Sequence, residues 1–80
     1  MTLSSRGQKA LNLLKDGGYM VERLERDSYT NKEQFKTRFM DNKMNIIKGL
    51  GVKTKFELED NNINFSIWNT TSVSSYYKIA

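Results

Sequence analysis

The stretch Asn31–Leu50, with the sequence NKEQFKTRFMDNKMNIIKGL, is the one that we expect to decide the fold. Its apolar residues recur at the spacing of an α-helix, in which about 100° separates successive side chains. They form one narrow stripe, and the opposite side is polar and basic. The stripe consists of Phe35, Phe39, Ile46 and Leu50, with Met40 and Ile47 along its edge. The stretch therefore predicts an amphipathic helix.

The two ends of this predicted helix carry start and stop signals. Thr30 and Glu33 have the spacing of a capping box, in which each side chain bonds the backbone N–H of the other residue. Gly51 suits the left-handed position that follows a helix C-terminus. Lys43, however, falls inside the apolar stripe. Either its aliphatic stem lies along the core, or the helix breaks at Asp41-Asn42 into two shorter helices.

Two segments after this stretch show the alternation of β-strands. In Val52–Trp68, apolar and polar residues alternate on both sides of Asn61-Asn62, which predicts a β-hairpin with a two-residue turn. Asn tolerates the positive φ that such a turn requires. Val73–Ile79 alternates again and predicts a further, C-terminal strand.

The segment before the stretch begins with a short helix. Ser4 or Ser5 can cap it, Lys15 lies in its last turn, and Gly17-Gly18 can end it. Tyr19-Met20-Val21 then has the aromatic and β-branched character of a short strand. For Glu22–Tyr29 we expect a helix of two turns. The alternative is that Tyr19–Asp27 continues as a polar edge strand.

The length and composition limit the class of protein. A chain of 80 residues predicts one domain, residues 1–80. Cys and His are absent, which removes thiolate metal ligands, the Cys nucleophile and the commonest general base, so we expect no enzyme, metal or cofactor. No apolar run reaches the roughly 20 residues that span a bilayer, and the N-terminus lacks the apolar core of a signal peptide. We expect a cytoplasmic protein.

Positive charge is concentrated around the predicted helix. The net charge is +4, and between Lys32 and Lys55 seven basic residues stand against two acidic ones. Gln, Thr, Arg and Asn side chains can reach base edges, and Lys side chains can hold phosphates. The pattern favours double-stranded DNA over the alternative of a simple solvated helix face. The candidate DNA-contacting residues are Lys32, Gln34, Lys36, Thr37, Arg38, Asn45, Lys48, Lys53 and Lys55.

Acidic and aromatic residues support two other interpretations. The tip of the predicted hairpin, Glu57–Asp60, is acidic and would be repelled by phosphate. That tip and the exposed aromatics could instead contact a protein, as in a phage-encoded inhibitor of a host enzyme. A third option is that Trp68, Tyr76 and Tyr77 form a platform on which single-stranded bases stack.

The order of predicted elements resembles a small winged-helix domain of the α+β class. The similarity lies in KALNLLKDGGYMV, then NIIKGLGVKTKF, then the hairpin and the final YYKI strand. It is similar to short winged helix-turn-helix proteins of phages, prophages and mobile elements. The resemblance implies two to three helices followed by a β-hairpin and a C-terminal strand. It also implies a DNA-binding regulator or accessory protein, acting as a dimer, with Asn31–Leu50 as the recognition helix.

Overall fold

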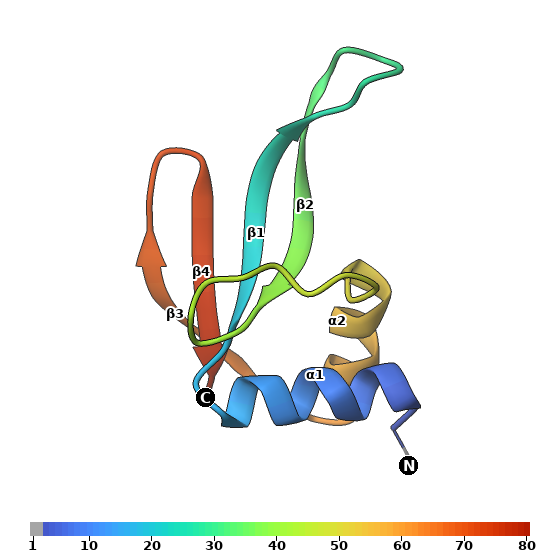
Figure 1. The fold of residues 1–80 in the computed structure, drawn as a ribbon, viewed down its shortest axis with the longest axis vertical. Coiled ribbons are helices and arrows are strands. Elements are labelled where there is room, and N and C mark those ends of the chain that lie inside the picture. Colours follow the sequence, from blue (N-terminus) through green and yellow to red (C-terminus); the bar gives the residue numbers. More distant parts are fainter. Residues whose placement is uncertain (1–2) are drawn as a thin grey trace.

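The computed structural model describes residues 3–80, and within them it contains two helices and one four-stranded antiparallel sheet (Figure 1). In chain order the elements are α1 (Ser5–Lys15), β1 (Tyr19–Arg26), β2 (Glu33–Met40), α2 (Val52–Asp60), β3 (Phe65–Thr70) and β4 (Ser74–Ile79). The strands lie in the order β2-β1-β4-β3, so the C-terminal strand β4 lies beside β1 in the middle of the sheet. The expected α+β class is confirmed.

The first helix and its stop are as predicted. The Ser4 hydroxyl accepts a hydrogen bond from the Gly7 N–H at 3.2 Å, which caps α1, and Lys15 lies in its last turn. Gly17 adopts φ +93° immediately after the helix, a conformation that costs glycine nothing. These signals act within a few residues of chain, which is why the sequence alone contains them.

The predicted helix over Asn31–Leu50 is wrong. Glu33–Met40 form strand β2, which pairs with β1 along its whole length; residues 31–32 belong to the turn before it, and residues 41–50 are an irregular connection to α2. In place of the Thr30–Glu33 capping box, the Asp27 carboxylate accepts hydrogen bonds from the backbone N–H groups of Tyr29 and Thr30 and so forms the turn before β2. Phe39 lies opposite Met20, and both side chains are buried. Pairing with β1 thus outweighs the local helical pattern.

The predicted helix over Glu22–Tyr29 is also wrong. Residues 22–26 continue the strand that begins at Tyr19, as the alternative proposed, and residues 27–29 belong to the turn that follows; β1 lies in the middle of the sheet between β2 and β4 rather than at an edge. The β1–β2 hairpin extends well beyond the rest of the sheet (Figure 1). Its outer part is polar because only solvent surrounds it.

The predicted hairpin over Val52–Trp68 is wrong in its first half. Val52–Asp60 form α2, in which Thr54 and Leu58, one turn apart, are both buried. The Asn61-Asn62 pair does reverse the chain, with Asn62 at φ +64°, but it connects a helix to a strand. The C-terminal strand expected over Val73–Ile79 is confirmed as β4, and its hairpin partner is β3. Each helix is therefore followed by a hairpin, and the predicted order with both helices before one hairpin is not found.

Both helices pack on one face of the sheet. The core there contains Ala10, Leu11 and Leu14 of α1, Leu58 of α2, Met20 and Phe39 of the sheet, and Leu50 of the connection. Side chains alternate between the two faces of a strand, so Tyr19, Val21 and Arg38 lie on the other face, which neither helix of the described chain covers. We call this second face the open face. No helix in the described residues 3–80 is long and apolar enough to cross a membrane.

Candidate nucleic-acid interface

The nine candidate DNA-contacting residues lie on four different parts of the structure. Gln34, Lys36, Thr37 and Arg38 lie on β2, and Lys53 and Lys55 lie on α2. Lys32 belongs to the turn of the β1–β2 hairpin, and Asn45 and Lys48 belong to the connection between β2 and α2. The single recognition helix that was expected to carry most of them does not exist.

The structure nevertheless brings several of these residues together at the outer edge of β2. Two adjoining hollows share Arg38 and the start of α2, and we call them together the β2-edge groove. The exposed side chains of Phe35 and Val52 form the apolar part of the lining. The first hollow is lined by Gln34, Phe35, Lys36, Thr37, Arg38, Gly51 and Val52, and the second by Arg6, Arg38, Lys53, Thr54 and residues 49–52.

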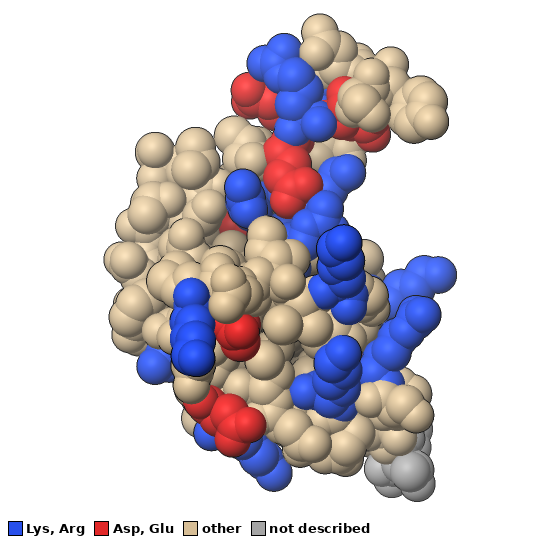
Figure 2. Space-filling model, viewed as in Figure 1, with Lys and Arg blue, Asp and Glu red and all other residues tan. Residues whose placement is uncertain are grey.

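Positive charge dominates this groove. It is lined by four cationic side chains and by no acidic residue. In Figure 2, Lys and Arg side chains gather along the side of the molecule that carries α2, below the projecting hairpin, and no acidic side chain is visible among them. The cationic residues are Arg6 of α1, Lys36 and Arg38 of β2, and Lys53 of α2.

Arg38 is held in place by a two-point contact with Glu25. Its Nε and Nη2 atoms donate to the two carboxylate oxygens at 3.2 and 3.0 Å. Such a pair fixes the guanidinium but also offsets its charge. Within residues 3–80, Arg6, Lys36 and Lys53 take part in no ion pair with an acidic side chain, so no direct pairing offsets their charge as it does at Arg38.

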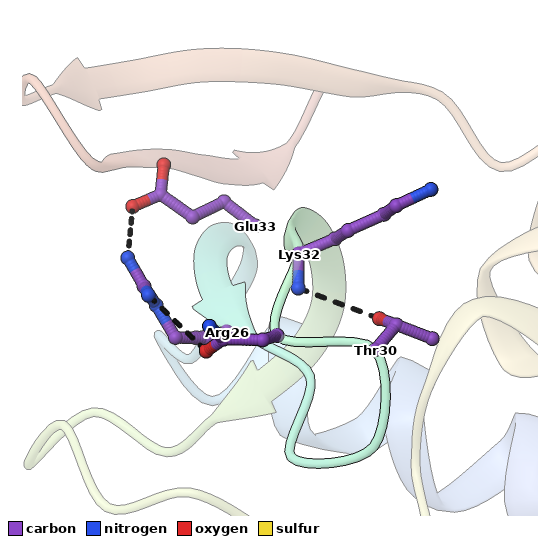
Figure 3. Close-up of polar contacts among 5 residues, drawn as sticks. Arg26, Thr30, Lys32 and Glu33 are labelled. Atoms are coloured by element: carbon purple, nitrogen blue, oxygen red, sulfur yellow. Dashed lines mark hydrogen bonds and ion pairs between the residues drawn. The ribbon is translucent and has the colours of Figure 1, made fainter.

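The other candidates are used differently. Lys55 points toward the sheet and pairs with Glu22 at 3.1 Å, and Asn45 bonds the carboxylate of Asp41 within its own turn. Lys32 lies at the far end of the hairpin. Figure 3 shows its side chain extending away from the neighbouring Arg26–Glu33 ion pair. These three residues, and Lys48 of the connection, are not part of the groove.

Arg6 is the groove residue that the sequence analysis missed. It lies in the first turn of α1, a segment that contains none of the predicted contact residues, 30 positions before Lys36 of β2. Only the packing of α1 against α2 brings it to Lys53. The sequence does show that Arg6 is a cation near the start of a predicted helix, but it does not show that Arg6 lies near β2.

The acidic tip is also placed differently from the prediction. Glu57, Glu59 and Asp60 lie on α2 and not at a hairpin turn. The carboxylate of Glu57 accepts hydrogen bonds from the backbone N–H and the hydroxyl of Ser4, at 2.8 and 2.7 Å. These bonds lower the pKa of Glu57 below its ordinary value. Glu57 thus joins the start of α1 to α2, and the acidic residues do not form the hairpin tip that was predicted.

Residues 3–80 contain no group of three or more acidic side chains close enough together to hold a metal ion. The chain matches no family model, no curated protein and no solved structure.

Proposed function

We propose that this protein binds double-stranded DNA through the β2-edge groove, as a regulator or accessory protein. The observation that carries the proposal is the convergence of four cationic residues from three elements on two adjoining hollows, neither of which is lined by an acidic residue; they are Arg6, Lys36, Arg38 and Lys53. A duplex presents closely spaced phosphates, and cations that neutralise them release counterions and so favour binding.

The shape beside the groove supports a duplex. The hairpin projects from the body, and together they form a concave outline on the side where the basic residues gather (Figure 2). A two-stranded β-ribbon has a width that the major groove of DNA admits. In this arrangement the strand β2, rather than a helix, faces the DNA. Gln34 is exposed on that strand and can bond a base edge, and Lys36 is two residues further along it.

The start of α2 adds a weaker attraction for phosphate. Gly51 precedes the helix without any side-chain cap, and the first turn of α2 contains no acidic residue. The backbone N–H groups there carry the partial positive charge of a helix N-terminus. They open on the same groove as Lys53 and Arg38.

The test is a salt titration with a charge-neutralised variant. Arg6→Gln combined with Lys53→Gln removes two uncompensated groove cations. Since log K changes with log salt by about −0.9 per phosphate contact, we expect the slope to become less steep by about 1.8. At about 0.1 M salt, affinity for a random-sequence duplex is expected to fall by roughly sixtyfold.

The matched control is Lys9→Gln combined with Lys15→Gln. It removes the same charge from exposed positions of α1 outside the groove. We expect its salt slope to be close to that of the unmodified protein, as measured by fluorescence anisotropy of a labelled duplex. Equal slopes for the two double variants would refute the groove as the binding site.

A further inference from the structure

The open face of the sheet carries an aromatic cluster that extends across β1, β4 and β3. Tyr19 of β1 contacts Trp68 of β3 and Tyr76 of β4, which are far from it in the sequence and also contact each other. The ring centroids of Tyr19 and Trp68 are 4.9 Å apart, and each lies 6.4 Å from that of Tyr76. The Nζ atom of Lys78 lies 5.1 Å from the Tyr19 ring and 5.4 Å from the Trp68 ring. We call these four residues the open-face cluster.

The cluster lies at the surface of the molecule. Trp68 is 51% exposed, although tryptophan is usually well covered when its role is packing alone. Both helices lie on the other face, where Tyr77 packs against the core, so Tyr77 does not belong to the cluster that was predicted for it. Val21 lies opposite Tyr76 in the sheet, on the same face, and is only 1% exposed. The cluster therefore covers part of the sheet and still presents ring surface to solvent.

The rest of the open face is basic. By the register of β1 with β2, Arg23 lies opposite Lys36, and Val21 lies opposite Arg38. All four share the face of Tyr19, because they alternate with the buried Met20 and Phe39. Among the described residues on this face of β1 and β2, the one acidic side chain is Glu25, and it already pairs with Arg38. An anionic chain lying across the open face would meet aromatic rings at one side and cations at the other.

We propose that the open face binds single-stranded nucleic acid, with an unpaired base stacked on the exposed side of Trp68 and phosphates near Lys78 and Arg23. Base stacking on aromatic side chains, combined with a basic path for the backbone, is a general way to hold single strands. The charge of the face complements any anionic chain, and the exposed ring of Trp68 beside it favours unpaired bases, whose flat faces stack on such rings. This inference concerns a ligand different from that of the duplex proposal, and the residues that it assigns to the ligand (Trp68, Lys78 and Arg23) do not line the β2-edge groove.

The single tryptophan makes a direct test possible. Trp68 is the only tryptophan in the chain, so the intrinsic tryptophan fluorescence of the whole protein reports on the cluster. Titration with oligothymidine of about ten nucleotides is expected to quench it in a saturable way. An abasic strand with the same number of phosphates is expected to quench little, because it has charge but no bases. No quenching by oligothymidine, or equal quenching by the abasic strand, would overturn the proposal.

Variants of the protein distinguish binding by base stacking on Trp68 from binding by charge alone. By anisotropy of labelled oligothymidine, Trp68→Ala is expected to weaken binding by about ten- to a hundredfold, and Trp68→Phe, which keeps a ring, by much less. Tyr29→Ala is the matched control, since Tyr29 is 97% exposed at the tip of the hairpin, and it should leave affinity unchanged. Circular dichroism checks the fold of each variant. If Trp68→Ala does not fold, Lys78→Gln, which keeps Trp68, decides the question in the fluorescence titration: its affinity for oligothymidine should fall, and an unchanged affinity would overturn the proposal.

The two proposals fail independently. Arg6→Gln with Lys53→Gln should weaken duplex binding and change oligothymidine affinity by no more than about threefold, because neither residue lies on the open face. Trp68→Ala should do the reverse. A protein ligand whose binding depends on Trp68, found together with unchanged fluorescence in oligothymidine, would replace single-stranded nucleic acid as the occupant of this face.

Discussion

Replacement of Gly18 by Ala tests the junction at which α1, β1 and β2 meet. A Cβ atom at Gly18 would lie 2.6 Å from the carbonyl oxygen of Met40 and 2.7 Å from that of Leu13. Both are backbone atoms, so relief requires a shift in the end of β2 or in the last turn of α1. The N–H of Gly18 also donates to the Leu13 carbonyl at 2.9 Å, which ties the residue to the helix end. Gly17 is the internal comparison, because its Cβ would meet only Asn42, at 3.6 Å.

The expected magnitudes differ because the two glycines are constrained in different ways. Gly17→Ala places a side chain at φ +93°, which costs about 1–2 kcal/mol. A gain of about 0.4–1 kcal/mol from the less flexible unfolded chain partly offsets this cost. Gly18→Ala has no such φ penalty but forces atoms into a close-packed junction, which costs about 1–3 kcal/mol. Since the opposing atoms are backbone, we expect a value near the upper end, about 2–3 kcal/mol.

Urea unfolding followed by circular dichroism measures the difference. With a slope of about 1 kcal/mol per molar urea for a small domain, the midpoint should fall by about 2–3 M for Gly18→Ala and by about 1 M or less for Gly17→Ala. Unchanged slopes would show that both variants unfold from the same compact state. A loss at Gly18 no larger than the loss at Gly17 would refute the close approach of the Met40 and Leu13 carbonyls.

Two further predictions concern α2. Leu58→Ala should lower the free energy of unfolding by about 2–5 kcal/mol, whereas Phe56→Ala, at a position 55% exposed, should cost about 1 kcal/mol or less. Equal losses in urea unfolding would instead favour a strand, in which both side chains share one buried face. Glu57→Gln should lower the melting temperature at neutral pH, because the carboxylate accepts two hydrogen bonds from Ser4 in the folded state. Since the folded pKa of Glu57 is depressed, this difference is present above the unfolded pKa and shrinks as pH falls through the folded pKa. A constant difference across that range would contradict the bond.

The candidate site was foreseeable in part. The concentration of basic residues from Lys32 to Lys55 is a property of the sequence, and Lys36, Arg38 and Lys53 do line one groove. Their distribution among elements was not foreseeable, because it depends on pairing with β1. The positions of Arg6 and of the open-face cluster depend on contacts between segments that are distant in the chain. No local pattern encodes such contacts.

The stretch Asn31–Leu50 shows why a periodic pattern can mislead. Phe35 and Phe39 are four residues apart, and this spacing puts them on one side of a helix and also on one face of a strand. The same holds for Thr54 and Leu58, which were assigned to a strand and lie on a helix. An even separation near one helical turn is thus compatible with both periods. Short segments contain too few apolar residues to distinguish the helical period from the strand period.

The sequence by itself determined α1, its stop at Gly17, the reversal at Asn61-Asn62 and the strand character of the C-terminal residues. Each of these depends on capping, positive φ or side-chain alternation within a few residues of chain. Only the tertiary structure decided that Glu33–Met40 is a strand and Val52–Asp60 a helix. The strand exists because β1 offers hydrogen-bond partners along its whole length, and the helix exists because it buries Leu58 against α1 and the sheet. Both reasons depend on partners that the local sequence does not contain.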